Sequence, residues 1–325
     1  MSVPRRFSAA GSRTVRGLLL LCLLTALPAA ACAQGVFAGS EVLWRIPLGD
    51  HVYTVPRVDG PRLYVGTNDA NIDHPMVKST GGGLLMCLDR DRGTLVWQLP
   101  IPRYMPGVIP PFHFDQWNCG ICSSPAVDGQ RLYVVSPRGD VLCLDRDGQA
   151  NGNDGPQTDE KTYMGISADS DYSLQPTDGD IIWQFNMLEQ LGVVPHDVCG
   201  SSPTLCGDFV YACTSNGVDD THAQVPRPQA PSLIALDKHT GQLAATDGAI
   251  IGDRILHGTW SSPVAAEFAG RPVILFGGGD GILRAFRPLA AAPPAGAVQT
   301  LEVVWQYDCC PYDYRVRDGQ PIAYA

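Results

Sequence analysis

The sequence predicts an all-β fold, a β-propeller built from four-stranded blades, and three observations lead to it. Glycine and proline are frequent, at 35 and 27 of 325 residues, and both interrupt long helices. Charged residues make up 17% and hydrophobic residues 45%, a balance that favours a packed core over a disordered chain. The third observation is an internal repeat of short strands.

Four segments of the chain repeat one pattern, in which a strand, a glycine-containing turn and a second strand form a hairpin. A third strand follows each hairpin, and a fourth strand carries a tryptophan in three of the units, at Trp97, Trp183 and Trp305. Regularly repeated short antiparallel strands are typical of propeller blades. We expect these blades near residues 53–100, 123–186, 201–247 and 261–308.

The ring of blades is expected to be incomplete. Residues 41–46 have the pattern of a fourth strand around Trp44, yet they precede the first hairpin. Because Trp305 already supplies the fourth strand of the last unit, this extra N-terminal strand belongs to a further blade, and the tail 309–325 leads toward that missing blade. The alternative is a closed ring of four blades. An open ring would leave strand edges exposed.

The first 33 residues are expected to form a signal peptide. Arginines precede an apolar run at 18–27 that is too short to span a bilayer, and Ala31-Cys32-Ala33 is a cleavage pattern. Two alternatives stay open: lipidation of Cys32, and twin-arginine export through Arg5-Arg6. All three routes predict an exported protein, periplasmic or extracellular, with no transmembrane segment in the mature chain.

The formal net charge of -10 argues against a nucleic-acid partner, because binding to a phosphate backbone needs a basic surface. The partner is therefore expected to be a protein or a small-molecule ligand.

A histidine-rich loop face is the candidate ligand-binding site. In an up-and-down blade, the loop between strands 2 and 3 and the loop leading to the next blade leave the same side of the sheet. By this parity, six of the seven histidines fall on one face: His51, His74, His113, His196, His222 and His257. Imidazole is a common metal ligand, so this face is predicted to bind a ligand, a metal or a protein. The alternative is ordinary loop histidines hydrogen-bonded to backbone.

Nine cysteines follow the signal region, and export permits disulfide bonds between them. Cys119-Gly120-Ile121-Cys122 lacks the following histidine of a c-type haem site. The pair precedes a strand, whereas a thioredoxin-like pair needs a helix N-terminus. We expect structural disulfides from Cys119, Cys122 and Cys199, with zinc as the alternative for the pair.

An acidic insertion in the second blade is a candidate calcium loop. Its oxygen-bearing side chains alternate with glycines, as calcium loops require, but it lacks the bidentate glutamate of an EF-hand. A solvated acidic loop is the alternative. The candidate ligands are Asp145, Asp147, Asn151, Asn153 and Asp154.

The blades also resemble those of a known superfamily. Asp89-x3-Gly93-x3-Trp97 and Ala235-Leu236-Asp237-Lys238-His239-Thr240-Gly241 are similar to the A-x-D-x-x-T-G-x-x-x-W motif of the pyrroloquinoline quinone (PQQ) repeat superfamily. Residues 151–156, 255–263 and 305–309 resemble secreted bacterial PQQ-binding-like repeat proteins. The resemblance covers the mature chain. It implies an exported propeller that acts as a ligand- or protein-binding scaffold through its histidine-rich face.

The resemblance leaves two other functions open. Methanol-type PQQ dehydrogenases stack an adjacent-cysteine disulfide on the quinone, and Cys309-Cys310 is such a pair, which implies an alcohol or sugar dehydrogenase that uses PQQ and calcium. The tryptophan platform, calcium ligands and catalytic aspartate of those enzymes have no assigned counterparts here. The propeller lipoprotein of outer-membrane assembly implies an envelope assembly factor. No G-x-S-x-G or H-E-x-x-H motif occurs, so binding is favoured over catalysis.

Overall fold

The structure is a computed structural model that describes residues 41–103, 117–255 and 257–310, with the strand residues 316–317 and 320–321. The chain divides into the units Met1–Val42 and Leu43–Ala325, and the fold below is that of the second. The predicted signal peptide and His113 lie outside the described residues. Among the described residues, no helix has the length and apolar character that crossing a membrane requires.

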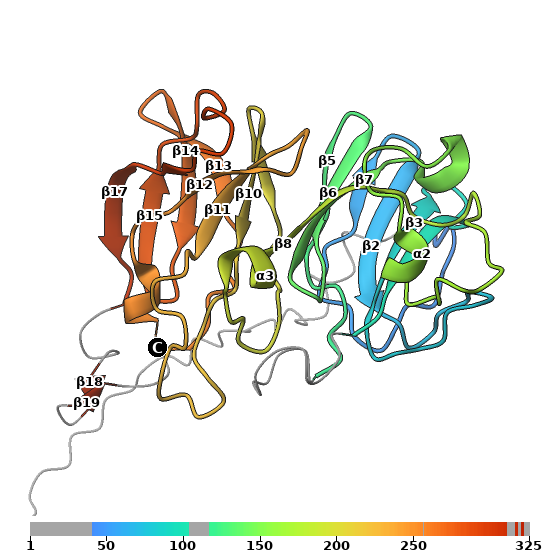
Figure 1. The fold of residues 1–325 in the computed structure, drawn as a ribbon, viewed down its shortest axis with the longest axis horizontal. Helices are drawn as coiled ribbons and strands as arrows, with labels where there is room; N and C mark the ends of the chain where they lie inside the picture. Colours follow the sequence, from blue (N-terminus) through green and yellow to red (C-terminus); the bar gives the residue numbers. More distant parts are fainter. Residues whose placement is uncertain (1–40, 104–116, 256, 311–315, 318–319, 322–325) are drawn as a thin grey trace, which may run out of the picture. The chain divides into compact units, whose positions relative to one another are not determined.

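Four antiparallel sheets follow one another along the second unit, and the predicted all-β class is confirmed (Figure 1). In each sheet the four blade strands are hydrogen-bonded in chain order, as in an up-and-down propeller blade. Blade 1 consists of β1 (Arg57–Asp59), β2 (Arg62–Asn68), β3 (Gly83–Asp89) and β4 (Leu95–Ile101). Blade 2 consists of β5 (Ala126–Asp128), β6 (Arg131–Val135), β7 (Asp140–Asp145) and β8 (Ile181–Asn186).

The remaining blades have the same order. Blade 3 consists of β9 (Thr204–Cys206), β10 (Phe209–Cys213), β11 (Leu233–Asp237) and β12 (Leu243–Thr246), with β16 (Gln299–Thr300) added parallel to β12. Blade 4 consists of β13 (Val264–Phe268), β14 (Arg271–Gly277), β15 (Ile282–Phe286) and β17 (Val303–Asp308). A separate hairpin pairs β18 (Val316–Arg317) with β19 (Gln320–Pro321).

The helical segments of the described residues are short and lie in the connections between strands. They are η1 (Gly148–Asn151), α2 (Glu160–Tyr163), α3 (Met187–Leu191) and η2 (Ile251–Arg254). Asn186 begins α3, since its side chain accepts a hydrogen bond from the Glu189 amide, and Gly192 ends it in the left-handed conformation at φ 64°. This cap sets where the chain leaves blade 2 for the loop that carries His196.

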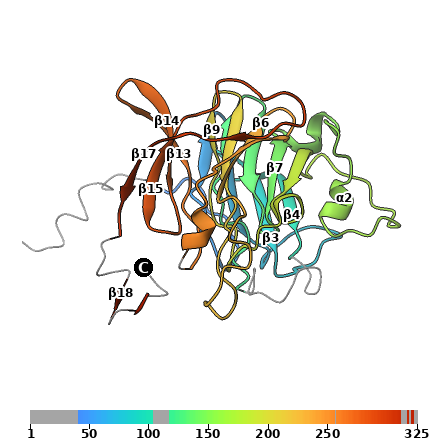
Figure 2. The ribbon, with the colours of Figure 1, turned by 60° about the vertical axis from the view of Figure 1, so that its left-hand side comes forward.

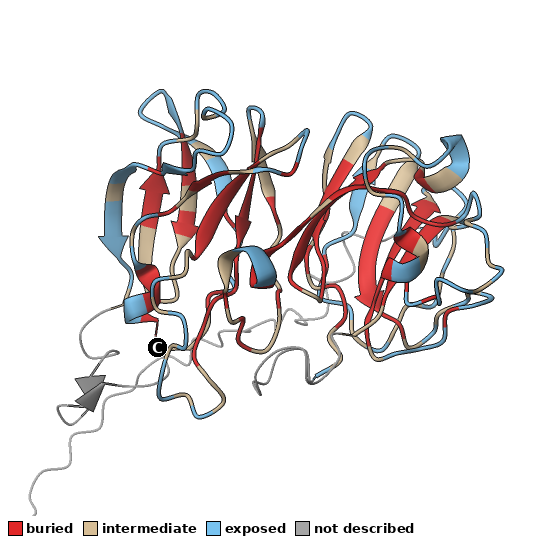
Figure 3. Ribbon diagram, viewed as in Figure 1, coloured by how far each residue is buried: buried red, intermediate tan, exposed pale blue. Residues whose placement is uncertain are grey.

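The hydrophobic core lies between successive blades. One cluster packs Trp97 and Leu99 of blade 1 against Leu142 of blade 2, and equivalent clusters join blade 2 to blade 3 and blade 3 to blade 4. Figure 3 shows the strands of the first three blades as largely buried, in red, and β17 as mostly exposed. Each inner blade is therefore stabilised through both of its faces.

A single contact recurs where one blade meets the next. Trp97 Nε1 of blade 1 donates a hydrogen bond to the Arg146 carbonyl of blade 2, at 2.8 Å. The ring lies so close to Gly148 that a Cβ at this glycine would stand 2.8 Å from it. Trp183 repeats both contacts on blade 3, with the Lys238 carbonyl at 3.1 Å and with Gly241. Glycine is required here because any side chain would displace the indole.

Trp44 makes this contact at the N-terminal end of the unit. Its Nε1 donates to the Arg90 carbonyl at 2.9 Å, and a Cβ at Gly93 would lie 2.4 Å from its ring. Trp44 thus takes the position of a fourth-strand tryptophan, although residues 41–49 form no strand, contrary to the expectation. A strand needs a hydrogen-bonded neighbour, and the described residues provide no ladder for this segment.

Trp305 lacks this contact. Its Nε1 is buried and, in the described part of the chain, no acceptor lies within hydrogen-bond distance. Its ring contacts Phe268 of its own blade, with ring centres 5.6 Å apart. Figure 2 shows β17 at the outer edge of blade 4. An unpartnered docking tryptophan is what an incomplete ring requires, and that expectation is confirmed.

We expect Trp97→Phe to lower the free energy of unfolding by about 1–3 kcal/mol, because the Arg146 carbonyl loses the closer of its two donors and keeps only the Tyr64 hydroxyl at 3.5 Å. Urea denaturation measures this. Trp305→Phe is the matched control: it removes an N–H that has no acceptor, so a change within about 0.5 kcal/mol is expected. Equal losses in the two variants would contradict the docking role of Trp97.

A buried ion pair holds the turn between β14 and β15. Arg284 donates to both carboxylate oxygens of Asp280, at 2.9 and 2.6 Å, and both side chains are at most 1% exposed. Arg254 adds a third contact at 3.2 Å. Burial by itself raises the pKa of Asp280, but the hydrogen bonds and charge of Arg284 outweigh it, so the pKa lies below its ordinary value.

A lowered pKa means that the folded state binds the Asp280 proton less tightly than the unfolded state. The stabilisation is therefore fully present above the ordinary aspartate pKa of about 4 and is lost as the pH falls through the lower folded-state value. We expect Asp280→Asn to cost about 3–5 kcal/mol at pH 7 and clearly less at pH 3, by chemical denaturation. Glu302→Gln, which breaks the exposed pair with Arg287, is the control and should change the stability little at either pH, because solvent screens an exposed pair. A loss from Asp280→Asn that does not change with pH would refute this assignment.

Candidate functional site

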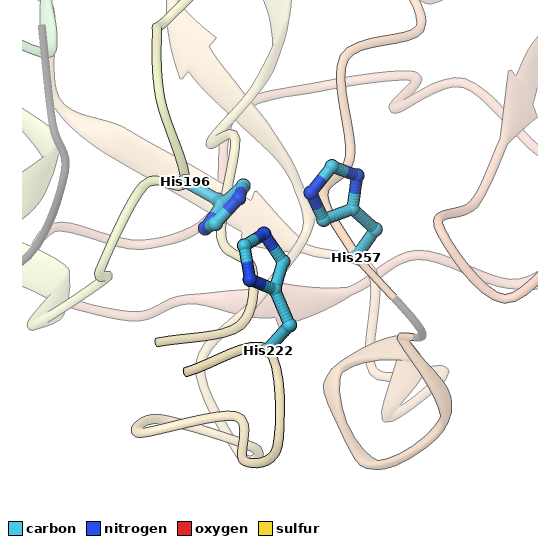
Figure 4. A group of neighbouring side chains, drawn as sticks. All are labelled: His196, His222 and His257. Atoms are coloured by element: carbon cyan, nitrogen blue, oxygen red, sulfur yellow. The ribbon is translucent and has the colours of Figure 1, made fainter. Parts of the chain in front are cut away.

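Three of the predicted histidines lie together: His196, His222 and His257 (Figure 4). They come from the connection between α3 and β9, the loop between β10 and β11, and the connection between η2 and β13. Each offers one ring nitrogen, and these nitrogens all lie within 4.8 Å of one another. The ring centres are 4.4 to 4.9 Å apart. We call these three residues the histidine triad.

Backbone hydrogen bonds hold the three loops against one another. The Gly217 amide donates to the Val194 carbonyl at 3.0 Å, and the Val218 amide donates to the His257 carbonyl at 2.8 Å. A Cβ at Gly217 would stand 2.6 Å from that of His196 and 2.8 Å from the His257 carbonyl. The absence of a side chain at Gly217 therefore lets the three loops approach closely enough for the imidazoles to meet.

The orientation of His196 is fixed by its own hydrogen bond. Its Nδ1 lies 2.9 Å from the Val218 carbonyl, and the residue is 3% exposed. A carbonyl can only accept, so Nδ1 carries the proton and Nε2 keeps its lone pair. This arrangement, with one nitrogen bonded to a carbonyl and the other presented, is how proteins orient metal-binding histidines.

Trp260 forms one wall of the triad. Its Nε1 donates to the His196 carbonyl at 3.0 Å, and its ring stands perpendicular to that of His257 at 5.1 Å. A Cβ at Gly258 would lie 2.6 Å from the indole, so this wall also depends on a glycine. The indole shields His257 from water on this side.

The electrostatics of the triad favour a neutral His257. Burial, together with the neighbouring His196 and His222, lowers the pKa of His257. The carboxylate of Asp197 lies 3.7 Å from His196 Nε2. His222 adopts a left-handed backbone at φ 57°, which is uncommon for a residue with a side chain. Neutral imidazole is the form that ligates metal ions, so His257 is suited to bind a cation.

The geometry matches a nitrogen-rich transition-metal site. Zinc binds imidazole nitrogens at about 2.0–2.1 Å in a tetrahedron, which separates its ligands by about 3.3 Å. The ring nitrogens of the triad, within 4.8 Å of one another, are close to that separation. Imidazole ligands suit zinc, copper and nickel, whereas calcium and magnesium prefer oxygen.

Two other predicted histidines of this face, His74 and His51, are not members of the triad. His74 Nε2 is 3.0 Å from Asp178 Oδ1, and its Nδ1 accepts from the Met76 and Val77 amides at 3.2 Å. The His74 side chain is 2% exposed, so it ties a loop of blade 1 to blade 2. His51 Nδ1 lies 3.0 Å from the Asn118 carbonyl.

The acidic insertion brings two predicted calcium ligands together. Oxygens of Asp145 and Asp154 lie within 4.8 Å of each other and of Asp180, a residue that was not among the predicted ligands. Burial, and then the charges of Glu160, Asp145 and Asp154, raise the pKa of Asp180 to about 7. Strand pairing could have identified it, because the Asp145 amide bonds the Asp180 carbonyl across blade 2.

The other predicted calcium ligands have protein partners. Asp147 pairs with Arg62 at 3.1 Å, and Asn153 donates to Glu160 at 3.0 Å. Asn151 donates to Asp154 at 3.4 Å. Calcium binding by this insertion stays a prediction.

The cysteines form no disulfide bond among the described residues. The expected disulfide role of Cys119, Cys122 and Cys199 stays a prediction. Cys309 is exposed at the end of β17, where its amide donates to the Gly281 carbonyl at 3.0 Å, and Cys310 is half-buried.

A PQQ ring stacked on a cysteine pair needs an enclosed slot with a second flat wall. Around Cys309 and Cys310 the described residues offer instead the exposed strand β17. These residues do not fit the quinone, and we derive no step through it.

Several solved structures are similar to this chain at low sequence identity. No protein-family model matches the sequence, and no curated protein matches it either. Among solved structures, BamB from Moraxella catarrhalis is similar over 78% of this chain and 50% of its own, at 13% identity and a TM-score of 0.38. The quinohemoprotein alcohol dehydrogenase ADHIIG from Pseudomonas putida HK5 is similar over 82% and 35%, at 15% identity and a TM-score of 0.44.

A europium-containing methanol dehydrogenase is similar over 86% of this chain and 46% of its own, at 14% identity and a TM-score of 0.46. The chain thus spans half or less of the length of these proteins. We therefore infer the function of the chain from the arrangement of its own side chains.

Proposed function

We propose that this chain is an exported β-propeller that works as a metal-binding module, with His196, His222 and His257 as the ligands of one divalent transition-metal ion, zinc in the first place. The observation that carries the proposal is the convergence of three ring nitrogens, from three separate loops, to within 4.8 Å of one another.

Three features favour a metal ion over histidines that serve only as loop hydrogen-bonding groups. The Val218 carbonyl fixes His196 so that Nε2 is the nitrogen left to bind an ion. The Asp197 carboxylate at 3.7 Å adds a negative charge beside the triad. The net charge of -10 also attracts cations to the molecule.

A binding role is supported better than the two alternatives. The dehydrogenase alternative depends on Cys309 and Cys310, which lie at an exposed strand end. The assembly-factor alternative needs a protein-binding surface, for which no described group of residues argues as specifically as the triad does for a metal. Three protein ligands would also leave a zinc ion one open position for an exchangeable ligand.

Removing a triad ligand should abolish tight metal binding. We expect His257→Ala to weaken zinc binding at least about 100-fold, beyond the 10–100-fold that loss of an outer-shell partner costs. Isothermal titration of the untagged mature protein measures the affinity, and Co²⁺ absorption reports nitrogen coordination. His239→Ala is the matched control, since His239 is exposed and lies on the opposite face by strand parity. The proposal is wrong if both variants keep the same affinity and stoichiometry as the unmodified protein.

A further inference from the structure

A hollow of about 400 Å³ opens beside the histidine triad. His51, Tyr53, Trp117, Cys119, Asp197 and Trp260 are among the residues that line it. Its volume lies within the range of small-molecule sites in proteins, about 300–1,000 Å³. One lining residue, His51, belongs to the face predicted to bind a ligand, but the proposed metal site does not include the hollow.

The hollow and the triad share two walls. Trp260 lines the hollow and also packs against His257, with ring centres 5.1 Å apart. Asp197 lines the hollow and places its Oδ2 3.7 Å from His196 Nε2, the nitrogen that is left to bind metal. Asp197 and Trp260 therefore connect the hollow to two histidines of the triad, His196 and His257.

Three large aromatic side chains are exposed around this one hollow. Tyr53 is 59% exposed, Trp117 is 61% exposed and Trp260 is 36% exposed. A cluster of exposed apolar side chains around a concavity indicates a binding site, whereas single exposed apolar residues are common on any protein surface. Aromatic side chains pack best against another flat ring, offset or edge to face. The walls therefore favour a planar ring as the occupant.

The charge of the occupant follows from the metal. Without an ion, Asp197 and the net charge of -10 repel an anion from the hollow. A divalent ion on three neutral imidazoles reverses the local charge and has an open position for an anionic oxygen. An anion should thus bind only when the metal is present.

We propose that the hollow binds a small planar aromatic carboxylate or phenolate whose oxygen completes the coordination of the metal ion held by the triad. This inference rests on the proposed function and adds a class of ligand to it. The aromatic ring of the ligand lies against Tyr53, Trp117 and Trp260, and its anionic oxygen points toward the histidines.

The test uses Co²⁺-loaded protein with benzoate as the probe. We expect benzoate to change the Co²⁺ absorption spectrum in a saturable manner and to quench tryptophan fluorescence over the same concentration range. Acetate, which has the charge without the ring, and benzyl alcohol, which has the ring without the charge, should both bind more weakly. The protein without metal should show no saturable fluorescence change with benzoate.

Variants separate the ring contacts from the metal. Tyr53→Ala and Trp117→Ala should each weaken benzoate binding by about 3–10-fold and leave the Co²⁺ affinity unchanged, because each removes one aromatic contact. Tyr307→Ala is the control, since Tyr307 is 67% exposed on β17 and lines no part of the hollow. Its benzoate affinity should equal that of the unmodified protein.

The outcomes distinguish the two proposals. A Co²⁺ spectrum that benzoate leaves unchanged would overturn this inference while the proposed metal-binding function stands. Equal benzoate binding with and without metal would overturn it as well. If no Co²⁺ spectrum forms at all, the proposed function fails and this inference fails with it.

Discussion

The packing of one indole onto the glycine turn of the next blade is the contact on which the order of the sheets depends. The contact has two parts, a hydrogen bond from Trp97 to the Arg146 carbonyl and the close approach of the indole that Gly148 permits. Strand pairing within a blade provides neither of them. Because the contact recurs at Trp183, it sets successive blades in equivalent positions. The hydrophobic clusters between blades then fill the space that these contacts define.

The position of the histidine triad follows from that order. A loop within blade 3 and the connections that enter and leave this blade emerge on one side, so side chains far apart in the sequence become neighbours. Backbone hydrogen bonds hold these loops against one another, and Gly217 lies where they come closest. These contacts fix the relative positions of the three imidazole rings. The geometry of the triad thus depends on the same two structural features as the fold: the repeated order of strands, and glycines at the points where two segments are in close contact.

Strand parity and the repeat were readable from the sequence, and they give the blades and the side on which His196, His222 and His257 lie. Parity says nothing about how far a loop reaches, so it grouped His74 with them, whereas hydrogen bonding to Asp178 holds His74 in a separate buried site. Asp180 was missed because it stands at the far end of the insertion, 26 residues after Asp154, and strand pairing brings it back beside Asp145. The prediction of a strand around Trp44 was wrong. The sequence pattern identified the docking tryptophan, but it could not show that the segment has no neighbouring strand to pair with.

The two ends of the blade series differ, and this asymmetry bears on how the molecule opens. In a row of repeats that contact only their neighbours, loss of structure starts at the terminal units. The first blade has its outer face covered by Trp44, Ile46 and Leu48, while blade 4 ends in the exposed strand β17 with an indole N–H that has no acceptor in the described chain. Fraying should therefore begin at blade 4 and stay local, so its amide hydrogens exchange with solvent before those of the inner blades.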